Sequence, residues 1–347
     1  MNRANTPKER VLARIAHQET ERTPYTLGFE GDVAERLDAH YGSDAWRGAL
    51  DNAIRRAPAP NLVVDTTSSA QTTDPYGCIW QVDRRPFHLV HAVLQDVDLG
   101  DYVFPDLAPV FTDAWRAEAE ATILDSPDHF WVVGFGFGLF ERTWTLRGFN
   151  EALMDAAGDP GYYAALTERV AEHQLEIIEH LLTLPVDGIM FSDDWGYQQG
   201  VLLGPERWRR FMKPHLARMY ARCHEAGVHT LSHCCGSVVD ILPDIIEIGL
   251  DVLESVQPEA RGMDPFDLKA RYGERITFWG GLGSQSTIPF GTPGEITRQV
   301  ERLCREMGRG GGYILTSAKS LQPETPTKNA AAVVEAFLAQ DGQAVPV

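Results

Sequence analysis

Several features that would define a function class are missing from this 347-residue sequence. No apolar run reaches about 18 residues, so no membrane-spanning helix is predicted. The segment Met1–Arg10 is polar and lacks the apolar centre of a signal peptide. There is no Gly-x-Ser-x-Gly elbow of a serine hydrolase, and no glycine-rich phosphate loop followed by Lys-Ser or Lys-Thr. These absences argue against a membrane protein, a secreted protein and two common enzyme classes.

Basic residues and cysteines are also scarce. The chain has 31 Lys and Arg against 49 Asp and Glu, a formal net charge of −18, and no run of basic residues. Such a surface repels nucleic acid and anionic lipid. Five cysteines without a regular spacing suit a reducing compartment. We therefore expect a cytoplasmic protein that acts on a small molecule and binds neither nucleic acid nor membranes.

Short apolar segments alternate with helical patterns along the chain. The predicted strands are 25–29, 62–65, 131–135, 188–192, 228–233, 252–256, 276–281 and 313–317. Strands that alternate with helices indicate a parallel sheet with helical crossovers, and eight such units predict a (β/α)₈ TIM-type barrel. A capping-box pattern at Thr6 and Glu9 predicts an N-terminal helical extension before the barrel. No linker is evident, so residues 1–347 are interpreted as one domain, with an insertion over 66–128.

Carboxylates follow two of the predicted strands, where active sites of such barrels lie. Asp193 and Asp194 come directly after the strand 188–192, and Glu141 follows the strand 131–135. These three residues are the catalytic candidates, as proton carriers or metal ligands. Each could equally cap the helix that follows. Because adjacent side chains face different ways, at most one of Asp193 and Asp194 is expected to reach a shared centre.

A His and a Cys end the strand 228–233. His233 and Cys235 are two residues apart, so both side chains would point the same way, with Cys234 turned away. Imidazole nitrogen and thiolate sulfur together suit zinc. His233 and Cys235 are therefore the metal-ligand candidates. The alternative is that His233 caps the next helix and both cysteines fill the core.

Other polar and aromatic residues are predicted at the same rim. The substrate-binding candidates are Trp195, Gln257, Trp279 and Gln285. Aromatic residues in such places can also be ordinary packing, and this alternative stays open for both tryptophans.

Several segments resemble the uroporphyrinogen decarboxylase superfamily, over about Thr6 to Phe337. The similar segments are 191–196, 233–236, 249–251 with Gln257, 279–281, and 323–326 with Asn329. The resemblance implies a (β/α)₈ barrel. It also implies one of two chemistries: cofactor-free decarboxylation of uroporphyrinogen, or zinc-dependent methyl transfer between a corrinoid protein and a thiol or folate acceptor.

The two chemistries leave different marks on the sequence. Decarboxylases of the superfamily carry an Arg-rich segment near the N-terminus, whereas here residues 23–32 include Glu30 and Asp32 and are acidic. An octacarboxylate would meet repulsion there. His233-x-Cys235 resembles the zinc motif of the corrinoid-linked methyltransferases. Their later Cys is absent, and Lys319 stands near its place.

A carboxylate would then have to complete the zinc shell, unless the metal is lost. The candidates for this ligand are Asp194, Asp193, Glu141 and Glu254. The resemblance thus favours a zinc-dependent methyltransferase of a corrinoid-linked demethylation pathway. It would move a methyl group between a small methylated compound or corrinoid protein and a thiol or folate-type acceptor, with the corrinoid carried by a partner protein. The alternatives are a metal-independent decarboxylase of a porphyrinogen-like or smaller acid, and a non-catalytic corrinoid- or tetrapyrrole-binding protein.

Overall fold

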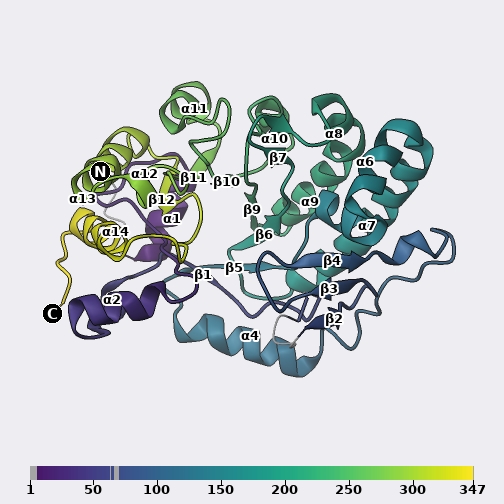
Figure 1. The fold of residues 1–347 in the computed structure, drawn as a ribbon, viewed down its shortest axis with the longest axis horizontal. Coiled ribbons are helices and arrows are strands. Elements are labelled where there is room, and N and C mark those ends of the chain that lie inside the picture. The colour runs from purple at the N-terminus through teal and green to yellow at the C-terminus, as the bar shows by residue number, and fades with distance from the viewer. Residues whose placement is uncertain (1–5, 63, 66–69, 347) are drawn as a thin grey trace.

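A curved sheet of parallel strands forms the centre of the molecule (Figure 1). The computed structural model describes residues 6–62, 64–65 and 70–346. Seven strands lie side by side in the order β1-β5-β6-β9-β10-β11-β12, and every pair is parallel. Their bounds are β1 Ile54–Arg56, β5 Phe130–Gly134, β6 Gly188–Ser192, β9 His229–His233, β10 Val252–Ser255, β11 Thr277–Leu282 and β12 Tyr313–Ser317.

The extended segment 25–29 closes this sheet between β12 and β1. Tyr25 forms a parallel bridge with Leu315. On the other side, the Ala53 backbone N–H donates to the Tyr25 carbonyl oxygen at 2.9 Å. The segment therefore takes the eighth position around the barrel, and the predicted TIM-type fold is confirmed.

One predicted strand is wrong. Residues 62, 64 and 65 form no strand, and residues 63 and 66–69 lie outside the described residues. The strand at this position of the barrel is β1. Leu62 is fully buried, so its apolar character reflects packing against the core and not strand pairing.

Helix α1, Pro7–Ile15, lies at the amino-terminal ends of the strands. Thr6 and Glu9 form the predicted capping box, with the Glu9 N–H donating to Thr6 Oγ1 at 3.1 Å. The Arg14 carbonyl oxygen accepts hydrogen bonds from the Gly312 N–H, just ahead of β12, and from Thr277 Oγ1, at the start of β11. Val11 packs against the residues that fill the barrel interior, so α1 covers the bottom of the barrel.

The barrel interior is layered because side chains alternate along each strand. Below the mouth, the interior is apolar and contains Ile54, Phe130, Val132, Met190, Leu231, Val252 and Ile314, and Trp279, the strand partner of Glu254, packs against this cluster. Two residues further along four of these strands, the side chains become polar. These residues are Ser192, His233, Glu254 and Thr316. The polar layer lies at the carboxyl ends of the strands, where the sequence predicts the site.

Helices surround the sheet (Figure 1). They are α2 Val33–Tyr41, α3 Ala45–Ala49, α4 Asp113–Asp125, α5 Leu139–Arg147, α6 Phe149–Gly158, α7 Pro160–Leu181, α8 Pro205–Phe211, α9 Lys213–Glu225, α10 Leu242–Glu247, α11 Pro265–Tyr272, α12 Thr287–Phe290, α13 Pro293–Arg302 and α14 Thr327–Gln340, with a 3₁₀ turn η1 Val93–Gln95 and a π-helical turn η2 Leu303–Met307. Among the helices in the described ranges, none is both long and apolar enough to cross a bilayer.

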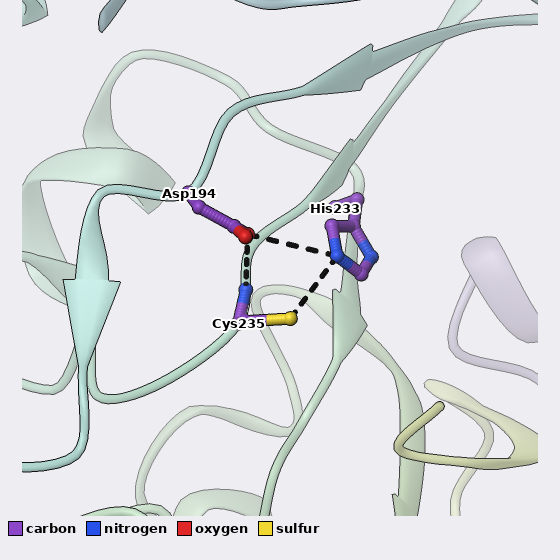
Figure 2. Close-up of side chains that lie close together, drawn as sticks. All are labelled: Asp194, His233 and Cys235. Carbon is purple, nitrogen blue, oxygen red and sulfur yellow. Dashed lines mark hydrogen bonds and ion pairs between the residues drawn. The ribbon is translucent and has the colours of Figure 1, made fainter. Parts of the chain in front are cut away.

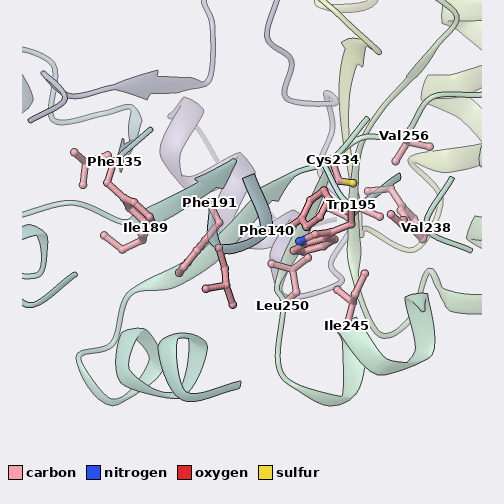
Figure 3. Close-up of a cluster of buried hydrophobic side chains, with 14 of the residues drawn as sticks. Phe135, Phe140, Ile189, Phe191, Trp195, Cys234, Val238, Ile245, Leu250 and Val256 are labelled. Carbon is pink, nitrogen blue, oxygen red and sulfur yellow. The ribbon is translucent and has the colours of Figure 1, made fainter. Parts of the chain in front are cut away.

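Apolar side chains of the helices and sheet form a continuous core. Figure 3 shows part of it, in which Phe191 of β6 and Ile245 of α10 lie with Trp195 and Cys234. The segment 205–225 forms two helices, α8 and α9. The break falls at Met212, because Pro214 lacks the N–H that would continue the helix.

The insertion contains a small antiparallel sheet. Its strands are β2 Gln71–Thr73, β3 Ile79–Gln81 and β4 His88–His91. Outside the insertion, a two-stranded hairpin follows β6 and consists of β7 Gly196–Tyr197 and β8 Gly200–Val201. Asp74 anchors the insertion on α5 through an ion pair with Arg142 at 3.7 Å, and these side chains are 1% and 2% exposed. Trp80 Nε1 donates to the same carboxylate at 2.9 Å. The insertion is therefore fixed directly beside the barrel mouth.

Candidate metal and catalytic site

Three side chains at the carboxyl ends of β6 and β9 converge on one point (Figure 2). His233 Nε2 lies 3.6 Å from Asp194 Oδ1 and 3.3 Å from Cys235 Sγ. The Cys235 backbone N–H donates to Asp194 Oδ1 at 2.7 Å, which holds the two loops together. The three ligand atoms all lie within 4.8 Å of one another, and each residue is half-buried.

Glu254 of β10 fixes the orientation of His233. The two residues are direct partners across the parallel strands, and Glu254 Oε2 lies 2.7 Å from His233 Nδ1. This contact leaves Nε2 facing Cys235 and Asp194. Burial opposes a charged imidazole, but Glu254 and Cys235 together raise the pKa of His233 well above its usual range. Burial likewise opposes the charge on Glu254, yet the facing imidazole lowers the pKa of this carboxyl group.

The donor set fits zinc. One imidazole nitrogen, one thiolate and one carboxylate oxygen are ligand types that Zn²⁺ takes, and catalytic zinc sites keep three protein ligands and an open position. A carboxylate on the second nitrogen of a ligating His is the usual outer-shell partner. Cys234 is 1% exposed and packs in the core, as strand alternation predicts (Figure 3).

Asp193 faces away from this cluster. Its carboxylate accepts hydrogen bonds from the backbone N–H groups of Phe140 at 2.9 Å and Glu141 at 2.8 Å, and from Trp195 Nε1 at 2.6 Å. It therefore caps the N-terminus of α5 from a neighbouring loop. Burial raises the pKa of Asp193 to about 7 although the three N–H donors lower it. Asp193 is 1% exposed and its carboxylate oxygens accept these three hydrogen bonds, so the structure gives it a structural position, and its catalytic role stays a prediction.

Glu141 in the first turn of α5 stays beside the cluster. Burial first, and then the nearby charges of Asp193 and Asp194, raise the pKa of Glu141 well above its usual range. A carboxyl group whose pKa is raised keeps its proton to a higher pH than an exposed one, which suits a general acid. Of the three predicted catalytic carboxylates, the structure thus brings Asp194 and Glu141 to the site.

The four predicted substrate-binding residues have different environments. Trp195 is 1% exposed, and its ring centroid lies 5.5 Å from that of Trp208. It is therefore a core residue, and this burial argues against contact with a substrate. Gln285 lies on an exposed loop, where it accepts a hydrogen bond from Gln198 Nε2 at 3.0 Å. Trp279 lines a cavity at the barrel mouth, and its Nε1 donates to Thr26 Oγ1 at 3.0 Å.

Gln257 supports the loop that carries the metal-ligand candidates. Its Oε1 accepts a hydrogen bond from the Gly236 backbone N–H at 3.0 Å. Its Nε2 atom is buried without a hydrogen-bond partner. Gly236 has a φ of +75°, and a Cβ atom there would lie 2.6 Å from the Tyr197 nitrogen, so this loop packs tightly against β7.

Two cavities open at the carboxyl ends of the strands. The mouth cavity, of about 520 Å³, is lined by Asn52, Arg55, Arg56, Glu254 and Trp279 among others. The aromatic cavity, of about 490 Å³, is lined by Val64, Trp80, Phe87, Gly136, Phe137, Glu141, Trp144 and Ser192. Both volumes suit a small molecule. The sequence analysis missed Arg56 and the aromatic residues of the insertion, although the period-two pattern could have indicated the inward position of Arg56, two residues after Ile54.

A parallel barrel with a polar cluster at the carboxyl ends of its strands defines the fold class of many enzymes. Comparison with known families is more specific. The profile of the family "Uroporphyrinogen decarboxylase (URO-D)" matches residues 117–339, which is more than half of the chain. The chain therefore belongs to the uroporphyrinogen decarboxylase family, as the sequence predicts.

Individual relatives are distant. Uroporphyrinogen decarboxylase from Thermus thermophilus is 27% identical over 181 residues, covering 51% of this chain and 49% of that protein. The enzyme from Coxiella burnetii is 24% identical over 274 residues, covering 69% of this chain and 72% of that protein. The chain thus spans about half the length of the first of these curated relatives.

A solved structure extends the likeness to nearly the whole chain. A methyltransferase from Methanosarcina mazei superposes with a TM-score of 0.68 at 20% identity, covering 96% of this chain and 98% of that one. At this identity, the likeness shows the fold.

Proposed function

We propose that this protein is a zinc-dependent methyltransferase of a corrinoid-linked demethylation pathway. The observation that carries the proposal is the convergence of Asp194 Oδ1, His233 Nε2 and Cys235 Sγ within 4.8 Å. Asp194 supplies the third donor that the missing Cys would otherwise provide. Lys319, near the place of that Cys, is exposed.

The residues of the site have separate tasks in this proposal. His233, Cys235 and Asp194 would hold zinc, which supplies Lewis acidity toward a heteroatom of the substrate. Glu254 fixes the imidazole through Nδ1. Glu141 exchanges a proton with the heteroatom that gains or loses the methyl group, since its pKa lies well above the usual range.

The transfer itself is heterolytic. In the demethylation direction, the bond between the heteroatom and the methyl carbon breaks, and its electron pair stays on the heteroatom, which takes the Glu141 proton. A reduced corrinoid on a partner protein would supply the nucleophile that accepts the methyl group, and a thiol or folate acceptor would take the methyl group onward.

Anaerobic methyl transfer from methylcobalamin tests this function. The zinc-loaded protein is mixed with methylcobalamin and a series of thiols or tetrahydrofolate, and the absorbance of cob(I)alamin is followed. We expect turnover that is lost in His233→Ala and Cys235→Ser. Cys304→Ser is the matched control, because Cys304 lies on η2, away from the cluster.

Methylcobalamin that stays intact with every acceptor would contradict the proposal. Cobalamin binding without turnover would favour a non-catalytic binding protein.

Metal-independent decarboxylation is the second candidate, and one observation favours it. Arg56 lines the mouth cavity and would place a guanidinium group near an anionic substrate, whereas the Arg55 guanidinium is held by Ser126 Oγ at 2.9 Å. The acidic residues ahead of them are paired, Glu30 with Arg85 at 2.8 Å and Asp32 with Arg36 at 3.2 Å. Release of carbon dioxide from uroporphyrinogen by chelator-treated protein would establish this alternative.

A further inference from the structure

Apart from Glu141, the lining of the aromatic cavity has no role in the chemistry described so far. Its walls come from distant parts of the chain: Trp80 of β3 and Phe87 ahead of β4, both in the insertion, and Phe137 just ahead of α5 with Trp144 in the second half of that helix. The insertion is thus a component of the cavity and not a surface decoration. Its anchoring to α5 by Asp74 and Arg142 holds the two halves of the wall together.

The aromatic wall is preformed. Trp80 and Phe137 stack with ring centroids 5.5 Å apart and an interplanar angle of 16°, and Trp144 meets Trp80 edge-on at 6.4 Å. Trp80 is buried, with its Nε1 held by Asp74. A flat apolar ligand would therefore meet rings that are already in place, which lowers the entropic cost of binding.

The polar side chains of the cavity lie on the side of the metal-ligand cluster. They are Glu141 and Ser192. Ser192 ends β6 and is the strand partner of His233. A ligand in this cavity would thus have its apolar part on the insertion and any heteroatom beside the cluster.

The charge of the lining excludes other ligand classes. The lining contains no Lys or Arg. The adjacent Arg142 is buried and paired with Asp74, and its Cζ atom lies 3.5 Å from the centroid of the Tyr76 ring. An anionic ligand would therefore find no cationic partner. Trp80 and Phe137 turn one ring face each toward the other, which leaves fewer ring faces to surround an organic cation.

We propose that this cavity binds an uncharged aromatic ring with a methoxy group, the ring against Trp80 and Trp144 and the methoxy group beside Ser192. The further statement that the methoxy carbon is the methyl group transferred rests on the proposed function. The binding itself does not require that function.

Calorimetric titration tests the binding with methoxybenzene, benzoate and phenyltrimethylammonium as probes. Each is titrated into the zinc-loaded protein and into the chelator-treated protein. We expect saturable binding of methoxybenzene that is stronger than binding of either charged probe. Trp144→Ala should weaken it at least about tenfold, and Trp144→Phe should retain most of it. Trp115→Ala on α4 is the matched control, because Trp115 packs on Phe111 and does not line the cavity.

No saturable binding of methoxybenzene, a preference for benzoate or phenyltrimethylammonium, or an unchanged affinity in Trp144→Ala would each overturn the assignment. The ligand series and Trp144→Phe keep the test decisive if Trp144→Ala does not fold. Methoxybenzene binding by a protein that takes up no zinc would retain the cavity assignment and reject the proposed function.

Discussion

Glu254 lies directly across the parallel strands from His233, with Oε2 2.7 Å from Nδ1. This single contact decides which imidazole nitrogen is free. It turns Nε2 toward Cys235 Sγ and Asp194 Oδ1, so the three candidate ligand atoms converge because a carboxylate on the next strand occupies the other nitrogen.

Replacement of Glu254 by Ala should therefore weaken zinc binding about 10- to 100-fold, since outer-shell carboxylates orient the ligating imidazole. Competition with a chromophoric chelator measures the affinity. Glu247→Ala is the control, because that carboxylate is on the surface and pairs with Lys213. Equal zinc affinity in Glu254→Ala and wild type would show that the contact does not position His233.

The adjacent carboxylates Asp193 and Asp194 should give opposite phenotypes. Asp193→Ala leaves three buried N–H donors without an acceptor, and we expect the free energy of unfolding to fall by about 2–4 kcal/mol. Asp194→Ala should lose zinc, with a smaller change in the free energy of unfolding. Denaturant titration and metal analysis of both variants separate these roles. Loss of zinc with retained stability in Asp193→Ala would reverse our assignment.

The ion pair between Asp74 and Arg142 should be essential to the insertion. Arg142→Ala leaves a buried carboxylate without its cation, and we expect a loss of about 3–5 kcal/mol in the free energy of unfolding. The exposed pair of Arg218 with Glu168 provides the control, and Arg218→Ala should cost at most about 1 kcal/mol. Comparable losses in the two variants would mean that the buried pair does not anchor the insertion.

His173 of α7 should make stability depend on pH. Burial, and then the charge of Arg142, lower the pKa of His173 to about 4. The unfolded chain has a histidine pKa of about 6.5, so it binds the proton more tightly than the folded protein. The contribution of His173 to the free energy of unfolding is therefore fully present above about pH 6.5. It is lost as the pH falls toward 4, by on the order of 2–3 kcal/mol.

His173→Phe isolates this contribution, because the ring at this position packs on Phe104 at 4.8 Å and Phe cannot titrate. Denaturant titrations between pH 4 and 7 compare the two proteins. A parallel decline in wild type and His173→Phe would assign the pH dependence to other groups.

The barrel was predictable from the sequence because most of its strands are apolar segments bounded by helices. The strands 188–192 and 313–317 are predicted with the bounds that the structure has. β1 was missed because it has only three residues, two of them Arg, while the apolar Leu62 nearby gave a stronger signal. Short strands draw their stability from neighbours that a local pattern does not contain.

The site was predictable only in part. His233 and Cys235 were identified by period-two spacing, and their proximity to Asp194 follows from neighbouring parallel strands. Which of Asp193 and Asp194 faces the site depends on α5, whose N-terminus takes Asp193 as its cap. Trp195 looked like a pocket residue beside two carboxylates, yet its indole packs into the core. Contacts over such distances in the sequence are set by tertiary packing.

The zinc content of the purified protein tests the central claim most directly. Mass spectrometry of the unchelated wild type should find about one zinc per chain, and the content should fall in His233→Ala, Cys235→Ser and Asp194→Ala but not in Cys304→Ser. Absence of zinc from the wild type even after zinc is offered, or retention of zinc in all three ligand variants, would contradict the account.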